Sequence, residues 1–312
     1  MDQAERLREL VKIKKQGNVD IDNKNIEDSE YINYNYKKIS TKVIAVASGK
    51  GGVGKSNFTV NVALELSKMG NRVMILDADL GLANVDILLG INPKYNLSHV
   101  LKEEKEMRDI ITETEYGIKV IASGSGIKEL VNLSNQQRTK FIEKISELDD
   151  IVDILLIDTG AGISKNTLSF MYAADYTIIV TTPEPTALMD AYGLIKVSSL
   201  NKKGIQLKLI VNIVNSKEEA KEISSRVILL SRRFLNIFVE PYGYIFRDKN
   251  VLNSVMLQKP FSIQYPDTKA TQCVKQIAEK ISLKMSKEKN QTTEVHQEAG
   301  NIFRRIFEVF NK

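Results

Sequence analysis

The chain has 312 residues, of which 43% are apolar and 27% are charged, and its formal net charge is +5. This length and composition are ordinary for a globular protein with one large α/β domain and appendages, or with two small domains. We expect a cytoplasmic protein, because no secretory signal is recognisable and no apolar run approaches the ~18 residues that cross a bilayer. The single cysteine, Cys273, excludes internal disulfides and cysteine-only metal or iron–sulfur sites within one chain.

The two segments at the start of the chain differ in pattern. Residues 1–15 carry apolar side chains at helical spacing, including Ala4, Leu7 and Leu10, which predicts an N-terminal helix. Residues 16–40 are polar, rich in Asn and Asp, and have no sustained period. We therefore predict that this second segment is a flexible linker.

A phosphate-binding motif follows, of the form G-x-x-x-x-G-K-[ST] with an additional lysine at its second position. The β-branched run Lys42–Ala47 before it predicts a buried strand, and residues 57–69 after it have helical apolar spacing. In that context, backbone N–H groups and the helix N-terminus favour phosphate. We expect Lys55 to reach the β- and γ-phosphates and the Ser56 hydroxyl to bind Mg²⁺. The predicted nucleotide-binding residues are Gly49, Lys50, Gly51, Gly52, Val53, Gly54, Lys55, Ser56 and Asn57.

The rest of the chain up to residue 285 alternates strand-like runs with helical segments. The further strand candidates are Arg72–Asp77, Ile118–Ala122, Ile151–Asp158, Tyr176–Thr181 and Leu207–Ile213. This alternation predicts an α/β domain over residues 41–285, with a mostly parallel sheet and helices on both faces.

Carboxylates follow two of these predicted strands. Asp158 ends an apolar strand and precedes a glycine-containing loop, which places it at the usual ligand crevice of an open α/β sheet. Asp77 and Asp79 follow another strand and project similarly if that strand continues. We expect Ser56, Asp77 and Asp158 to hold Mg²⁺, Asp158 through a water molecule.

These motifs resemble those of the MinD/ParA ATPases, beginning with the deviant Walker A motif at residues 50–56. The resemblance continues through residues 77–86, 155–162, 183–196 and 211–216, and it covers about residues 40–285. It implies a MinD-like P-loop NTPase that binds ATP or ADP with Mg²⁺ and forms a homodimer with ATP.

Roles for single residues come from the same resemblance. The implied catalytic residues are Lys50, which reaches the nucleotide of the opposite subunit, Lys55, and Asp79, which helps to place the attacking water. Asn212 matches the adenine-contacting asparagine, and Pro241 lies in a segment similar to the loop on the other side of the base. Asn57 departs from the threonine of many relatives, so only its backbone N–H is carried over as an α-phosphate contact.

The N-terminal residues Met1–Arg8 resemble the DQAxxLR element of the flagellar-number regulators called FlhG, FleN or YlxH. In that family the element stimulates FlhF, a signal-recognition-type GTPase that sets where flagella are placed. The implied partner-activating residues are Asp2, Gln3, Leu7 and Arg8. The alternative is that residues 2–15 pack on their own domain and stabilise it.

The end of the chain combines a polar stretch at residues 286–299, predicted to be a linker, with an amphipathic segment at residues 300–312. At about 100° per residue, its large apolar side chains fall on one side of a helix and Arg304 and Arg305 on the other. We predict a helix that binds the surface of an anionic membrane, with docking onto its own domain as the alternative. Its membrane-binding residues would be Ile302, Phe303, Arg304, Arg305, Ile306, Phe307, Val309 and Phe310.

The predicted function is an ATP-hydrolysing, ATP-dimerising switch that associates reversibly with the inner face of the cell membrane. With an FlhF-type GTPase it would regulate flagellar number and placement. A flagellar switch-complex protein and a transcription activator are further candidate partners, and no specific nucleic acid is expected. The alternatives are a septum-positioning MinD protein, which the long head disfavours, and a DNA-bound ParA-type partition ATPase, which the apolar terminal helix disfavours. A nucleotide-held scaffold with negligible turnover stays open, because a sequence sets no rate.

Overall fold

The computed structural model describes residues 41–79, 84–124, 126, 144, 148, 151–202 and 204–291. The predicted N-terminal helix, the 16–40 linker, residues 292–299 and the predicted terminal helix at 300–312 lie outside these residues. The expected roles of Asp2, Gln3, Leu7 and Arg8, and of the apolar and basic residues at 302–310, therefore remain predictions.

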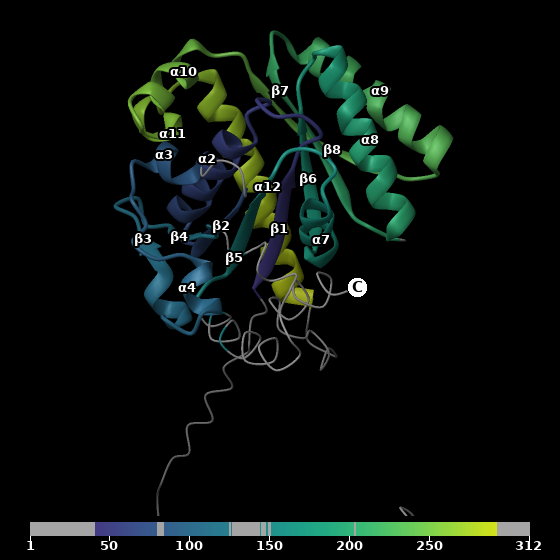
Figure 1. Ribbon diagram of the computed structural model, residues 1–312. Helices are drawn as coiled ribbons and strands as arrows, with labels where there is room; N and C mark the ends of the chain where they lie inside the picture. Colours follow the sequence, from purple (N-terminus) through teal and green to yellow (C-terminus); the bar gives the residue numbers. More distant parts are fainter. Residues whose placement is uncertain are drawn as a thin grey trace, which may run out of the picture. The chain divides into compact units, whose positions relative to one another are not determined.

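A single eight-stranded sheet forms the centre of the described domain, in the order β3-β4-β2-β5-β1-β6-β7-β8 (Figure 1). Every neighbouring pair is parallel except β3 and β4, which are antiparallel. This confirms the predicted α/β fold with a mostly parallel sheet. The strands are β1 (Lys42–Ala47), β2 (Val73–Ala78), β3 (Ile111–Glu113), β4 (Lys119–Ala122), β5 (Ile154–Thr159), β6 (Tyr176–Thr181), β7 (Leu207–Val214) and β8 (Val239–Phe246).

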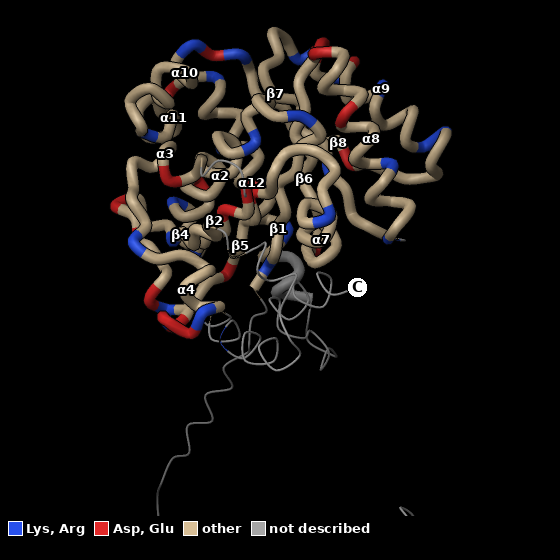
Figure 2. Tube along the Cα trace, viewed as in Figure 1, with Lys and Arg blue, Asp and Glu red and all other residues tan. Residues whose placement is uncertain are grey.

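Helices cover both faces of the sheet. They are α2 (Lys55–Lys68), α3 (Val85–Leu89), α4 (Leu97–Leu101), α7 (Lys165–Ala173), α8 (Pro185–Asn201), α9 (Lys217–Leu235), α10 (Lys249–Met256), α11 (Phe261–Gln264) and α12 (Lys269–Gln291), with a short 3₁₀ helix, η1, at Met107–Ile110. The distribution of charges stabilises α9, which has Glu218 and Glu219 in its first turn and Arg232 and Arg233 in its last turn (Figure 2). Acidic residues at a helix N-terminus and basic residues at its C-terminus both complement the helix dipole.

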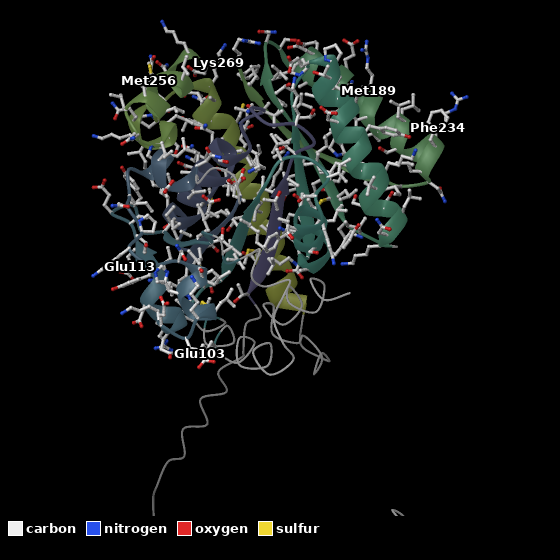
Figure 3. All side chains as sticks on the ribbon, in the orientation of Figure 1. Glu103, Glu113, Met189, Phe234, Met256 and Lys269 are labelled. Carbon is white, nitrogen blue, oxygen red and sulfur yellow. The ribbon has the colours of Figure 1, made fainter. Side chains whose placement is uncertain are left out.

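The core lies on both sides of the sheet because successive strand residues point to opposite faces. In β1, Ile44 and Val46 belong to the core that includes α2 and α12, whereas Val43 and Ala45 belong to the core that includes α4 and α7. A third core packs α8 and α9 against β6 and β7. Apolar side chains that stay exposed include Met189, Phe234 and Met256, which point away from the domain in Figure 3. Every strand predicted from an apolar run is present, with shifts of a few residues at its ends.

Two boundaries differ from the predictions. The polar linker predicted from residue 286 does not begin there, because α12 continues to Gln291. Residues 286–291 are rich in Lys, Glu and Gln, which have high helix propensity, so a helix anchored by apolar contacts earlier in α12 extends through them. The expected loop at Pro241–Gly243 is part of strand β8 instead. β8 is an edge strand, where proline is tolerated because one side of the backbone has no ladder partner.

Candidate nucleotide and magnesium site

The phosphate-binding loop connects β1 to α2 and leaves no room for side chains at two of its glycines. A Cβ on Gly49 would lie 2.2 Å from the backbone of Asp190 in α8, and a Cβ on Gly54 would lie 2.3 Å from Asn212 Nδ2. Gly54 also has a φ of 88°, which is the left-handed conformation that glycine adopts without strain. The loop is therefore held against both α8 and the end of β7. The first N–H groups of α2 have no partner within the helix and are available to a phosphate.

A buried ion pair lies beneath this loop. Lys55 Nζ donates to Asp158 Oδ1 at 2.7 Å, and both side chains are buried. Thr59 Oγ1, one turn further along α2, donates to the same carboxylate oxygen at 3.1 Å. The other oxygen, Asp158 Oδ2, is buried and has no hydrogen-bond partner among the described residues. The structure therefore pairs Lys55 with Asp158, a contact that the sequence did not indicate, and leaves one acceptor for a further ligand.

Asp77 lies directly beside Asp158, because the two residues are register partners in the parallel pair β2–β5. Its carboxylate accepts the backbone N–H groups of Asp79 at 3.1 Å and Val85 at 3.3 Å. The pKa of Asp77 is raised from 3.8 to about 7, mainly by burial and also by the neighbouring Asp158 carboxylate. The two N–H groups and Lys55 act in the opposite direction but do not offset the burial.

These donors fit a magnesium ion. Mg²⁺ prefers oxygen ligands and usually keeps several waters, and here a buried carboxylate oxygen without a partner lies next to a second buried carboxylate. The Ser56 side chain belongs to the first turn of α2 and lines the same hollow as Lys55 and Asp79. The structure thus places Asp77 and Asp158 side by side at neighbouring strand ends and Ser56 at the hollow, while their role as magnesium ligands stays a prediction.

The hollow on the phosphate side of the loop has a volume of about 570 Å³. Asp79 is half-buried and lines this hollow together with the loop residues. A Cβ on Gly160 would be 3.7 Å from Asp79 Oδ1, so the loop after β5 lies close to this carboxylate. Asp79 is therefore at the rim of the hollow that the phosphates would enter, which is where a residue that positions water must lie.

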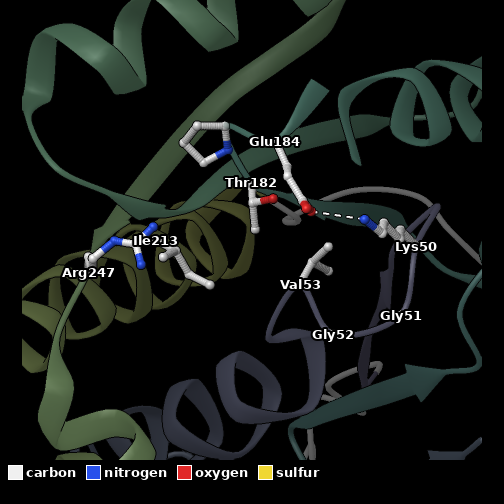
Figure 4. Close-up of a pocket in the computed structure, with 9 residues that line it drawn as sticks. Lys50, Gly51, Gly52, Val53, Thr182, Glu184, Ile213 and Arg247 are labelled. Carbon is white, nitrogen blue, oxygen red and sulfur yellow. Dashed lines mark hydrogen bonds and ion pairs between the residues drawn. The ribbon is translucent and has the colours of Figure 1, made fainter. Parts of the chain in front are cut away.

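Lys50 points away from this hollow and is bound to its own chain. Its Nζ donates to Glu184 Oε2 at 2.9 Å (Figure 4). It also donates to Thr186 Oγ1 at 2.9 Å. The lysine side chain is 36% exposed and the glutamate is 62% exposed. Ion pairs this exposed contribute only about 0–1 kcal/mol, so Lys50 can exchange this partner for another at little cost.

A smaller hollow of about 330 Å³ lies on this second side of the loop (Figure 4). Lys50 and Arg247 are the cations that line it, and Glu184 is its carboxylate. Thr182 and Pro183, which follow β6, and Ile213 of β7 complete its wall. Side chains from the ends of β6, β7 and β8 therefore meet around the phosphate loop.

The third hollow, of about 510 Å³, is the place where a base can bind. Asn212 lines it, as predicted, and its Nδ2 donates to the Val53 carbonyl of the phosphate loop at 2.8 Å. The expected contribution of Pro241 is wrong, because Pro241 lies inside β8, paired with Leu209, and lines none of the three hollows. Parallel strands form their ligand crevice at their carboxyl ends, so the residues that follow β8 take this place instead. Phe246, the last residue of β8, lines the hollow, as do Arg247 and Asp248 after it.

Several contributors were not identified from the sequence. Thr59 binds Asp158, and Glu184 binds Lys50. Each partner is far away in the chain, so no local sequence pattern identifies either residue. Asp248 has a local signal, because its Oδ1 caps α10 by accepting the Asn250 N–H at 2.9 Å. An Asx residue before a helical stretch, directly after a strand, predicts a site at the sheet edge.

Comparisons with known proteins point to the same architecture. Residues 39–282 match the ParA family, described as NUBPL iron-transfer P-loop NTPase. The antiactivator FleN of Pseudomonas aeruginosa is 38% identical over 240 residues, which are 77% of this chain and 86% of that protein. The flagellum site-determining protein YlxH of Helicobacter pylori is 41% identical over 196 residues, 62% of this chain and 66% of that protein. The septum site-determining protein MinD of Pyrococcus horikoshii, solved with Mg-ADP, is 26% identical with a TM-score of 0.62, over 77% of this chain and 96% of that one.

Within the described part of the chain, no helix has both the length and the apolar character needed to span a membrane. The same residues contain no group of three or more His, Cys, Asp or Glu side chains arranged to hold a metal. The candidate magnesium site has two carboxylates and a hydroxyl, and therefore does not form such a group.

The raised pKa of Asp77 predicts a pH-dependent effect of Asp77→Asn on the nucleotide-free, magnesium-free chain. The folded pKa of about 7 exceeds the ordinary 3.8, so the folded state holds this proton more tightly, and stability falls as the pH rises between these values. Asparagine does not ionise, so the variant does not lose stability in this way as the pH rises. The melting temperature of the variant minus that of the wild type should rise by roughly a few °C between about pH 5 and pH 8. Asp267→Asn, at an exposed position, is the control, and a difference independent of pH would contradict the prediction.

Proposed function

Because the chain belongs to the ParA family of P-loop NTPases, we propose that it is a MinD-like ATPase that regulates the number and placement of flagella. The observation that carries this proposal is the similarity to FleN over 86% of that protein, combined with a complete phosphate-loop site in this chain. The iron transfer named in the family description is not proposed, since the chain has one cysteine and it is buried in α12.

Hydrolysis would use the residues gathered at the phosphate-side hollow. When a nucleotide enters, its phosphates compete with Asp158 for the Lys55 ammonium, and the N-terminus of α2 binds the phosphate oxygens. Ser56, Asp77 and Asp158 would hold Mg²⁺, the last through a water. The ion supplies positive charge that neutralises the phosphates. Asp79, at the rim, would position the attacking water.

ATP would also close a homodimer, and Lys50 is the residue that would connect the two subunits. Its bonds to Glu184 and Thr186 hold it outside its own phosphate-side hollow. Because this ion pair is exposed and weak, the phosphates of a nucleotide in a facing subunit can compete for the lysine. Dimerisation would then depend on ATP, and hydrolysis would reset the chain to the monomer.

The terminal segment at residues 300–312 would attach the dimer to the inner face of the cell membrane. A single helix of this size binds reversibly, since ordering about ten residues costs on the order of 10 kcal/mol and offsets most of the apolar burial. Two copies on one dimer raise the overall affinity by about 10²–10⁴ without new contacts. Membrane attachment would therefore follow the nucleotide state.

The N-terminal segment would act on an FlhF-type GTPase. Stimulation needs a polar side chain beside the attacking water of that enzyme, and Gln3 within Asp2–Arg8 is the candidate. A linker of the length of residues 16–40 reaches about 25–30 Å, which suits delivery to a neighbouring protein.

The proposed nucleotide switch predicts different behaviour of three variants in size-exclusion chromatography with light scattering in Mg-ADP and Mg-ATP. Lys50→Ala should bind ADP and stay monomeric with ATP, because its partner is across the interface. Lys55→Ala should lose nucleotide binding. Asp79→Ala should bind ATP, hydrolyse it roughly 10²-fold more slowly and accumulate as dimer. A monomeric Asp79→Ala in ATP, beside a dimeric wild type, would remove the hydrolytic role of Asp79.

The membrane proposal predicts that deletion of residues 301–312 abolishes sedimentation with anionic liposomes and leaves ATP binding intact. Phe307→Asp should have nearly the same effect, because it places a charge within the apolar side of the helix. Asn311→Asp is the matched control, since it adds the same charge on the polar side. Equal sedimentation of truncated and full-length chains with ATP would exclude membrane binding through this segment.

The cellular function predicts that deletion of the gene changes the number of flagella per cell, counted by electron microscopy. The wild-type gene should restore the number, and Lys50→Ala should not, because it lacks the ATP dimer. Gln3→Ala should disturb flagellar placement while the purified variant still dimerises with ATP. Cells without the gene that keep the normal number and position of flagella would refute the flagellar assignment.

A further inference from the structure

Asn57 occupies the junction between the phosphate side and the base side of the nucleotide site. It is the third residue of α2 and lines both the 570 Å³ hollow and the 510 Å³ hollow. The other residues that line both are Gly52, Gly54 and Val255. Among these shared positions, Asn57 is therefore the only one with hydrogen-bonding side-chain atoms.

The chemistry of a nucleotide determines what meets this junction. The β- and γ-phosphates belong on the side of Lys55, and the base belongs on the side of Asn212. The groups between them in any nucleoside diphosphate or triphosphate are the α-phosphate and the ribose. Asn57, which lines both hollows, would therefore lie beside these two groups in a bound nucleotide.

The Asn57 side chain is available for such contacts. It is half-buried, and its amide forms no hydrogen bond with the described residues, although its main-chain carbonyl accepts Asn61 Nδ2 at 2.7 Å. A carboxamide offers two N–H donors and one carbonyl acceptor, whereas threonine offers a single hydroxyl. Asparagine can thus donate a hydrogen bond to a phosphate oxygen and accept one from a sugar hydroxyl at the same time.

Asn61, one helical turn after Asn57, holds the backbone of Asn57 in place through the hydrogen bond to its carbonyl. Asn61 is buried, and besides its bond to Asn57 its Oδ1 accepts the backbone N–H of Ser262 in α11 at 2.8 Å. This bridge ties the first turn of α2 to the helix that carries Phe261, which lines the base-side hollow. A side chain held on such a rigid segment loses little freedom on binding, so its hydrogen bonds contribute more to affinity.

We propose that Asn57 recognises the sugar of the nucleotide: its side-chain amide donates to the α-phosphate and its side-chain carbonyl accepts a ribose hydroxyl. The site would then be selective for ribonucleotides over deoxyribonucleotides. This inference rests on the proposed function as an ATPase, and it adds a specificity-determining residue to that site.

The test is isothermal titration calorimetry of the full chain with Mg²⁺ and ADP, 2′-deoxy-ADP or 3′-deoxy-ADP. We expect the wild type to bind ADP about 3- to 10-fold more tightly than at least one deoxy analogue, as expected for one hydrogen bond to an uncharged group. Asn57→Ala should bind ADP more weakly and should no longer distinguish ADP from that analogue. Asn57→Thr should keep an α-phosphate contact, and hence most of the ADP affinity, without the distinction.

Asn201→Ala, at the end of α8 and away from all three hollows, is the matched control and should behave as wild type. Two results would overturn the proposal: a wild type that binds all three nucleotides equally, or an Asn57→Ala variant that keeps the wild-type ratio. Retention of the ratio in Asn57→Ala with its loss in Asp248→Asn would assign the hydroxyl to Asp248 instead. A wild type that binds neither ADP nor ATP would refute the proposed ATPase itself, which is a distinct outcome.

Discussion

The nucleotide site depends on one electrostatic constraint, which is that two buried carboxylates share a single buried cation. Asp77 and Asp158 are register partners at the ends of β2 and β5, and Lys55 is the only buried ammonium bound to either of them among the described residues. Burial and the neighbouring carboxylate raise the pKa of Asp77 to about 7 as a result. A second cation would remove this imbalance, and the unpartnered Asp158 Oδ2 shows where an additional ligand fits. The buried charges of the site are thus not balanced until a cationic ligand binds.

The two lysines of the phosphate loop differ in burial, and this difference suits them to different roles. Lys55 and its partner Asp158 are 6% and 0% exposed, so breaking this pair without a substitute leaves a charge in a low-dielectric interior. Lys50 is partly exposed and Glu184 is mostly exposed, and their pair contributes about 0–1 kcal/mol. A phosphate must therefore replace the Asp158 bond as Lys55 releases it, while Lys50 can leave Glu184 without compensation. The first lysine suits a role in binding, and the second suits a role in switching between partners.

The central strands and the aspartate at the end of β5 could be predicted from the sequence, whereas the edge strand β8 and the base-side residues after it could not. Strands such as β5 and β6 are buried on both faces and are continuous apolar runs, so their position, and that of Asp158 at the end of one, could be found directly. β8 contains Pro241 and Gly243 and has exposed positions, because it is an edge strand. Its composition resembles a loop, and the base-side residues were consequently placed too early in the chain. Glu184 could not be assigned, because its role arises only when α8 packs beside the loop.

The end of β7 shows why the remaining detail is not local. Residues 207–213 are predicted from the sequence as one uninterrupted strand, yet the pairing of β7 with β8 shifts between Val211 and Val214. Ile213 has a φ of 60°, an unfavourable value for a β-branched residue that costs of order 1–3 kcal/mol. Asn212 holds this conformation, since its Oδ1 accepts the Ile213 N–H at 2.9 Å while its Nδ2 binds the phosphate loop. One side chain, Asn212, therefore contacts the phosphate loop and also stabilises the strained backbone that lines the base-side hollow.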